Sequence, residues 1–198
     1  MKAVFLILVT FALHAVAAES SSAKAIHDLE GVYKHHFKNA LIASGKAPME
    51  ADTPYESEDI VEIVRYDDTH IYFRAELNFY NGHSCSISGL AAFEKNAFVF
   101  HDSEKAYDGG TPCTLTITQS IEAVNFTDRL TLDGRSICRA HCGIRGSLSD
   151  VSISKKTRRN IRYMDRLINS SEYQKAIADL KEYESDLSNK DGARNVVK

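Results

Sequence analysis

Residues 138–147, with the sequence CRAHCGIRGS, concentrate the groups of this chain that could recognise another molecule. Two cysteines and two glycines accompany the imidazole of His141, the guanidinium of Arg145 and the hydroxyl of Ser147. A loop anchored by disulfides loses little conformational entropy on binding, so this cationic segment suits insertion into a partner's cleft. We therefore predict a binding site at His141, Arg145 and Ser147. The alternative is that the glycines only permit a tight turn and that Arg145 is merely solvated.

The residue spacing disfavours metal binding and covalent catalysis. Zinc sites usually contain close pairs such as C-x2-C, which are missing here, and an oxidising compartment favours disulfides. Ser84 lacks the second glycine of a nucleophile elbow, and no H-E-x-x-H or phosphate loop occurs. We expect no catalytic residue, metal or cofactor, and keep a hydrolase without a sequence motif as an alternative. The metal candidates considered were His83, Cys85, Cys138, His141 and Cys142.

Residues 1–18 have the pattern of a cleavable signal peptide. Lys2 precedes an apolar run, residues 4–18, that ends in the small residues AVAA. The run is too short for a membrane span. The residue directly after it, where a lipoprotein would carry its lipidated cysteine, is Glu19. We expect a periplasmic or secreted protein without a stable membrane anchor and without a nucleic-acid partner.

The four cysteines, Cys85, Cys113, Cys138 and Cys142, are even in number, as expected for two disulfides in an exported chain. Three connectivities are compatible with the sequence. We favour Cys85 with Cys113 and Cys138 with Cys142, because the second pair encloses only three residues and would close locally.

Length and composition are those of one globular domain: 198 residues, of which 43% are hydrophobic and 26% charged. The formal net charge of -3 indicates no particular partner. The charges are unevenly distributed, with an acidic stretch at residues 50–68 and a basic one at residues 135–166. Such asymmetry can steer a charged partner, and the alternative is two solvated faces that happen to differ.

Strand patterns dominate the chain up to residue 153. Residues 70–80 alternate between apolar and polar, and Asn81-Gly82 is a strong hairpin signal. Many short strands separated by turns predict a closed or nearly closed antiparallel barrel. The fold class is therefore mainly β (α+β): an antiparallel β-barrel of about eight strands with a C-terminal helical hairpin. The expected strands are the second half of 26–42, then 60–66, 70–80, 84–93, 97–101, 113–119, 122–126, 129–132 and 136–138, with a loop at 44–55.

Helical periodicity begins at Thr157. Ile161, Met164, Leu167 and Ile168 recur at helical spacing. Ser171 with Gln174 then predicts a capping box for a second helix with an apolar stripe, which needs a surface to cover. We expect a signal peptide at 1–18, a barrel domain at 19–156, and a helical pair with a polar tail at 157–198, frayed from residue 188. The stripe comprises Tyr173, Ala176, Ile177, Leu180, Tyr183 and Leu187.

The Gly-x-Tyr motif at residues 31–33 and the segment Cys-x3-Cys-Gly-x-Arg-Gly-Ser resemble small bacterial periplasmic disulfide-containing barrels of the lysozyme-inhibitor type. The resemblance spans residues 31–153 and is architectural. It implies an exported, non-enzymatic binding protein, such as an inhibitor or immunity protein for a cell-wall hydrolase, whose partner is another envelope or extracellular protein. The helical pair is an addition to such proteins, and no inhibitory residue is transferred. The alternative is a carrier of a small apolar ligand inside the barrel.

Overall fold

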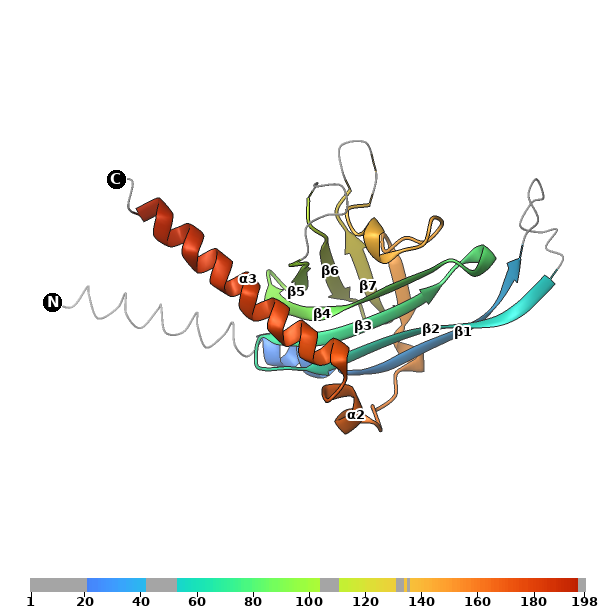
Figure 1. Cartoon of the computed structure of the whole chain (residues 1–198). Helices are drawn as coiled ribbons and strands as arrows, with labels where there is room; N and C mark the ends of the chain where they lie inside the picture. Colours follow the sequence, from blue (N-terminus) through green and yellow to red (C-terminus); the bar gives the residue numbers. More distant parts are fainter. Residues whose placement is uncertain (1–20, 42–52, 104–110, 131–133, 135, 196–198) are drawn as a thin grey trace.

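Eight antiparallel strands form a nearly closed barrel in which each strand pairs with the next (Figure 1). The computed structural model describes residues 21–41, 53–103, 111–130, 134 and 136–195, so the predicted signal peptide lies outside the described part. The predicted fold class is confirmed. The strands are β1 (Gly31–Leu41), β2 (Thr53–Arg65), β3 (His70–Asn78), β4 (Ser84–Glu94), β5 (Ala97–His101), β6 (Thr114–Gln119), β7 (Ala123–Asp128) and β8 (Val151–Ser154).

The helical elements are short, except for the last one. A helix over residues 21–29 precedes β1. Three of them are single 3-10 turns: one follows β3, one directly precedes Cys142, and one follows β8. Two α-helices end the described chain. These elements are η2 (Tyr80–Gly82), η3 (Arg139–His141), η4 (Lys155–Thr157), α2 (Met164–Ile168) and α3 (Ser171–Asn195).

Two strand boundaries differ from those predicted. β2 begins at Thr53 and pairs with β1 along the whole length of β1, so the proline-containing segment predicted as loop contributes its end to the sheet. The last strand is residues 151–154. Of the strands predicted at 129–132 and 136–138, the described residues show one isolated bridge, between Leu130 and Ser136, and residues 131–133 and 135 lie outside the described part. Both errors arise because strand pairing depends on a neighbouring strand as well as on local pattern.

The barrel closes between β1 and the segment after β8. Val32 and Arg159 exchange two backbone hydrogen bonds, each with an N···O distance of 2.8 Å. The side chain of Arg158 donates hydrogen bonds to the carbonyl oxygens that end the 21–29 helix, those of His27, Asp28 and Glu30. Part of the basic stretch therefore closes the barrel and caps a helix, instead of lying in the helical pair predicted from residue 157.

Gly31 is required where the helix turns into β1. Its φ of +152° is unfavourable for other residues, and a Cβ there would lie 3.0 Å from the Arg159 carbonyl oxygen. Of the stretch 26–42, the described residues 26–41 are helix before this glycine and strand after it, as predicted for the second half.

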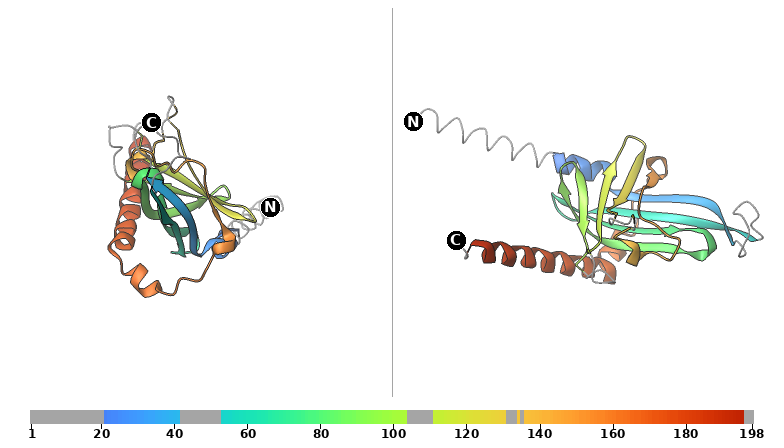
Figure 2. Two further views of the ribbon diagram at one scale, coloured as in Figure 1. Left: turned by 90° about the vertical axis from the view of Figure 1, so that its right-hand side faces the viewer. Right: turned by 90° about the horizontal axis from the view of Figure 1, so that it is seen from above.

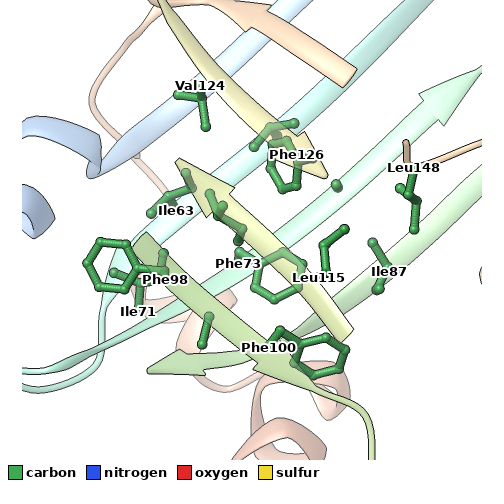
Figure 3. Close-up of a cluster of buried hydrophobic side chains, with 14 of the residues drawn as sticks. Ile63, Ile71, Phe73, Ile87, Phe98, Phe100, Leu115, Val124, Phe126 and Leu148 are labelled. Carbon is green, nitrogen blue, oxygen red and sulfur yellow. The ribbon is translucent and has the colours of Figure 1, made fainter. Parts of the chain in front are cut away.

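Side chains from all parts of the sheet fill the barrel interior (Figure 3). Phe73 packs edge to face against Phe100, with ring centroids 5.3 Å apart. The apolar face predicted from the alternation in β3 is buried, including Ile71, Phe73, Ala75 and Leu77. Figure 3 shows Ile63, Ile87, Phe98, Leu115, Val124, Phe126 and Leu148 converging on the same core.

A second apolar cluster lies on the outer face of β2, β3 and β4, where α2 and α3 cover it. Leu167 of α2 and the buried Tyr173 and Ala176 of α3 pack with Tyr72 and Leu90 of the sheet. Figures 1 and 2 show α3 running along the outside of the barrel, with its C-terminal half projecting beyond the strands. The predicted docking of the apolar stripe on the barrel is confirmed from Tyr173 to Tyr183, whose ring stacks on His101 of β5, whereas Leu187 is 44% exposed.

The C-terminal helices differ from the prediction in detail. The first helix starts only at Met164, because residues 158–163 are drawn out along the barrel seam. The backbone N–H of Tyr173 bonds to the hydroxyl of Ser170, so Ser170 caps α3, not Ser171. The helix continues to Asn195, past the predicted fraying point. None of the described helices is long and apolar enough to cross a membrane.

Candidate functional site

Two disulfides anchor the segment predicted to bind, and their pairing differs from the favoured one. Cys85 of β4 is bonded to Cys142, and Cys113 to Cys138, with Cα–Cα distances of 4.0 Å and 4.5 Å. The favoured local bridge between Cys138 and Cys142 is wrong, because Cys142 lies beside Cys85 of β4 and Cys138 lies beside Cys113, just before β6. The two bonds indicate an oxidising environment outside the cytoplasm.

The Cys85–Cys142 bond begins a turn, residues 142–147, that we call the tip loop. The tip loop lies against the β3–β4 hairpin, where the N–H of Gly143 bonds to the Ser84 carbonyl oxygen at 2.8 Å. The contact is close: a Cβ at Gly143 would lie 3.0 Å from Nδ1 of His83, and one at Gly146 would lie 2.7 Å from Sγ of Cys85. These two glycines allow the loop to fit onto the hairpin.

The outermost residues of the tip loop are Ile144 and Arg145. Ile144 is 80% exposed, and Arg145 is also exposed. Among the described residues, Arg145 has no hydrogen-bonding or ion-pair partner. An exposed isoleucine beside a free guanidinium combines an apolar anchor with a bidentate donor of hydrogen bonds. Ile144 is not among the residues predicted to bind, and its position between two glycines is the only signal for it in the sequence.

His141 and Ser147, the other two predicted binding residues, make contacts within the protein. Nε2 of His141 lies 2.8 Å from a carboxylate oxygen of Asp102, and the histidine side chain is only 23% exposed. The hydroxyl of Ser147 accepts a hydrogen bond from the N–H of Ser149 at 3.0 Å. The contact of His141 joins the segment to Asp102, and the contact of Ser147 is local, so both residues interact within the protein whereas Arg145 faces solvent.

The buried Asp128 connects residues on both sides of the segment to the barrel. Asp128, at the end of β7, is 5% exposed and accepts hydrogen bonds from the hydroxyls of Ser136 and Ser149. The N–H of Cys138 lies 3.4 Å from the same carboxylate. A buried carboxylate needs such donors, and here they join both sides of the segment to the barrel wall.

Four carboxylates of the acidic stretch lie on β2, and cations on neighbouring strands pair with two of them, Glu58 and Glu62. Glu58 pairs with Lys34 at 2.7 Å and with His36 at 2.9 Å, and Glu62 pairs with Arg74 at 2.6 Å. The predicted steering of a basic partner by this stretch is correspondingly weakened.

Within the described ranges, no cluster of three or more His, Cys, Asp or Glu side chains is arranged to hold a metal ion. All four cysteines are in disulfides. Models of known protein families, curated proteins and solved structures contain no match to this chain. The geometry of the site therefore carries the functional argument by itself.

Proposed function

We propose that this protein is an exported, non-enzymatic binding protein whose tip loop enters an acidic cleft of a partner protein. The proposed partner class is a cell-wall hydrolase, for which the protein acts as an inhibitor or immunity protein. One observation carries the proposal: the Cys85–Cys142 bond and the Gly143–Ser84 hydrogen bond hold a loop whose two outermost side chains face solvent.

The recognition chemistry follows from the two exposed side chains. Because the loop is anchored before it binds, little conformational entropy is lost on association. The guanidinium of Arg145 matches the geometry of a carboxylate, and hydrolases of this class hold essential carboxylates in their clefts. Ile144 supplies apolar area that becomes buried in the same contact.

The packing of the barrel supports a protein partner over a small ligand held inside. Eight-stranded barrels are just wide enough either to be filled by side chains or to hold one small molecule. Here five phenylalanine and tyrosine rings, those of Tyr33, Phe73, Phe98, Phe100 and Phe126, belong to the buried interior cluster. The carrier alternative would require these rings to move.

Calorimetry of the disulfide-intact protein against a panel of purified cell-wall hydrolases, including a lysozyme, tests the proposal. We expect saturable binding that a substrate oligosaccharide occupying the hydrolase cleft competes away. Arg145→Ala and Ile144→Ser should each weaken binding by about tenfold or more, as expected for central interface residues.

Arg139→Ala is the matched control, because Arg139 is an exposed arginine in η3 of the same segment but outside the tip loop. Its affinity should equal that of the wild type. No binding to any hydrolase of the panel would contradict the partner class. Equal losses for Arg139→Ala and Arg145→Ala would contradict the role of the tip loop.

A further inference from the structure

A charged cavity of about 280 Å³ lies on the outer face of the barrel, between strands β1 to β3 and the start of α2. It shares no lining residue with the tip loop. Three cationic side chains, two carboxylates and one phenol converge on it from β1, β2, β3, the linker before α2, and α2 itself. They are Lys34, Glu62, Arg74, Glu76, Tyr163 and Arg166.

An ion pair between the buried Glu62 and the partly exposed Arg74 forms part of the cavity wall. Glu62 is 1% exposed, and its carboxylate accepts a hydrogen bond from Nε of Arg74 at 2.6 Å and another from the hydroxyl of Tyr163. Burying the carboxylate of Glu62 is costly, so it requires the close contact with Arg74, whose side chain is still 30% exposed, and the additional hydrogen bond. The negative charge of Glu62 is thus already satisfied by the protein.

Lys34 is also neutralised internally, because its ammonium lies 2.7 Å from the carboxylate of Glu58. Two charges of opposite sign are left. Arg166 is exposed, with its guanidinium carbon 5.0 Å from the centre of the Tyr163 ring, and Glu76 is exposed on the outer face of β3. Among the described residues, neither forms an ion pair or a side-chain hydrogen bond.

We propose that this cavity binds a small zwitterion of the amino-acid or short-peptide class. The ligand carboxylate pairs with Arg166, a planar donor suited to bidentate contact, and the ligand ammonium pairs with Glu76. One unpaired charge of each sign complements such a molecule, whereas a simple anion would leave Glu76 unpaired. The volume of about 280 Å³ lies near the lower end of the range for small-molecule pockets, as expected for a ligand the size of an amino acid or a dipeptide.

Titration of the disulfide-intact protein, followed by amide chemical shifts in NMR spectra, tests the proposal. L-alanine and L-alanyl-L-alanine are the zwitterionic probes. N-acetyl-L-alanine lacks the ammonium, and L-alaninamide lacks the carboxylate. We expect at least one zwitterion to shift amides of β3 and α2 saturably. Both blocked compounds should bind at least about tenfold more weakly.

Substitutions test whether the zwitterion binds in this cavity. Arg166→Ala and Glu76→Gln should each reduce zwitterion affinity about tenfold, and both replace exposed side chains, so the fold is retained. Arg162→Ala is the matched control, since Arg162 is an exposed arginine four residues earlier that does not line the cavity. Absence of saturable shifts with both zwitterions would overturn the proposal. So would equally tight binding of a blocked compound, or unchanged affinity in Arg166→Ala and Glu76→Gln.

Discussion

The hydroxyl of Tyr163 donates a hydrogen bond to the buried carboxylate of Glu62, 101 positions earlier in the chain. Glu62 lies on the outer face of β2, and Tyr163 immediately precedes α2. This contact fastens the C-terminal segment to the barrel at the edge of the second apolar cluster. Burial would lower the pKa of Arg74 beside it, but the Glu62 carboxylate outweighs that effect and the pKa is raised.

Replacing Tyr163 with phenylalanine keeps the ring and removes only the hydroxyl, leaving one oxygen of Glu62 without its donor. We expect the free energy of unfolding, measured by urea denaturation, to fall by about 1–3 kcal/mol. Amides of α3 should also exchange faster with solvent. Tyr80→Phe is the control, because Tyr80 is 51% exposed, and its effect should stay within about 0.5 kcal/mol. An unchanged stability in Tyr163→Phe would show that the contact contributes nothing.

The same contact predicts a dependence on alkaline pH. Burial, assisted by the hydrogen bond to Glu62, raises the pKa of Tyr163 to about 12. In the unfolded chain the phenol has a pKa of about 10, so folding favours its neutral form. This contribution is complete below pH 10 and is lost as the pH rises through about 12.

Burial also raises the pKa of Tyr33 to about 12, so Tyr33 contributes to the pH dependence of stability in the same range. Because Tyr33 is present in both the wild type and Tyr163→Phe, the difference between these two proteins isolates the contribution of Tyr163. The stability advantage of the wild type over the variant should shrink as the pH rises from about 10 to about 12. Urea denaturation at several pH values measures it. A difference that stays constant over this range would contradict the assignment.

The two disulfides should contribute unequally. Replacing Cys85 and Cys142 with serine opens a bridge across 57 residues, and replacing Cys113 and Cys138 opens one across 25. In the loop-entropy account we expect losses of roughly 4 and 3.5 kcal/mol in the free energy of unfolding. Only the first variant should expose the Gly143 amide to fast hydrogen exchange. Recovery of a Cys138–Cys142 linkage in a non-reduced digest would refute the observed pairing.

Gly89 in β4 is predicted to tolerate no side chain. A Cβ there would lie 2.7 Å from Cδ2 of Phe100, whose ring packs in the barrel core. Gly89→Ala should therefore reduce the free energy of unfolding by about 1–3 kcal/mol. In a double-mutant cycle with Phe100→Leu, the penalty should shrink by at least about 0.5 kcal/mol, because the smaller side chain relieves the overlap. Strictly additive losses would exclude this contact as the cause.

Local pattern was sufficient for much of the architecture. The alternation in β3 identified the buried face, and Asn81 and Gly82 both have positive φ, 60° and 70°, as the hairpin signal requires. The apolar stripe of α3 identified the side that packs on the barrel. Each of these features depends on residues within a few positions of one another, so the sequence alone determined them.

Tertiary structure alone decided which distant groups meet. The partners of Cys85 and Cys138, the closure between Val32 and Arg159, and the contact of Tyr163 with Glu62 all join segments far apart in the chain. Periodicity says which face of an element is buried but not which residue lies opposite it. That pairing is set by how the sheet curls and closes, because only then do the ends of β1, β4 and β8 acquire their neighbours.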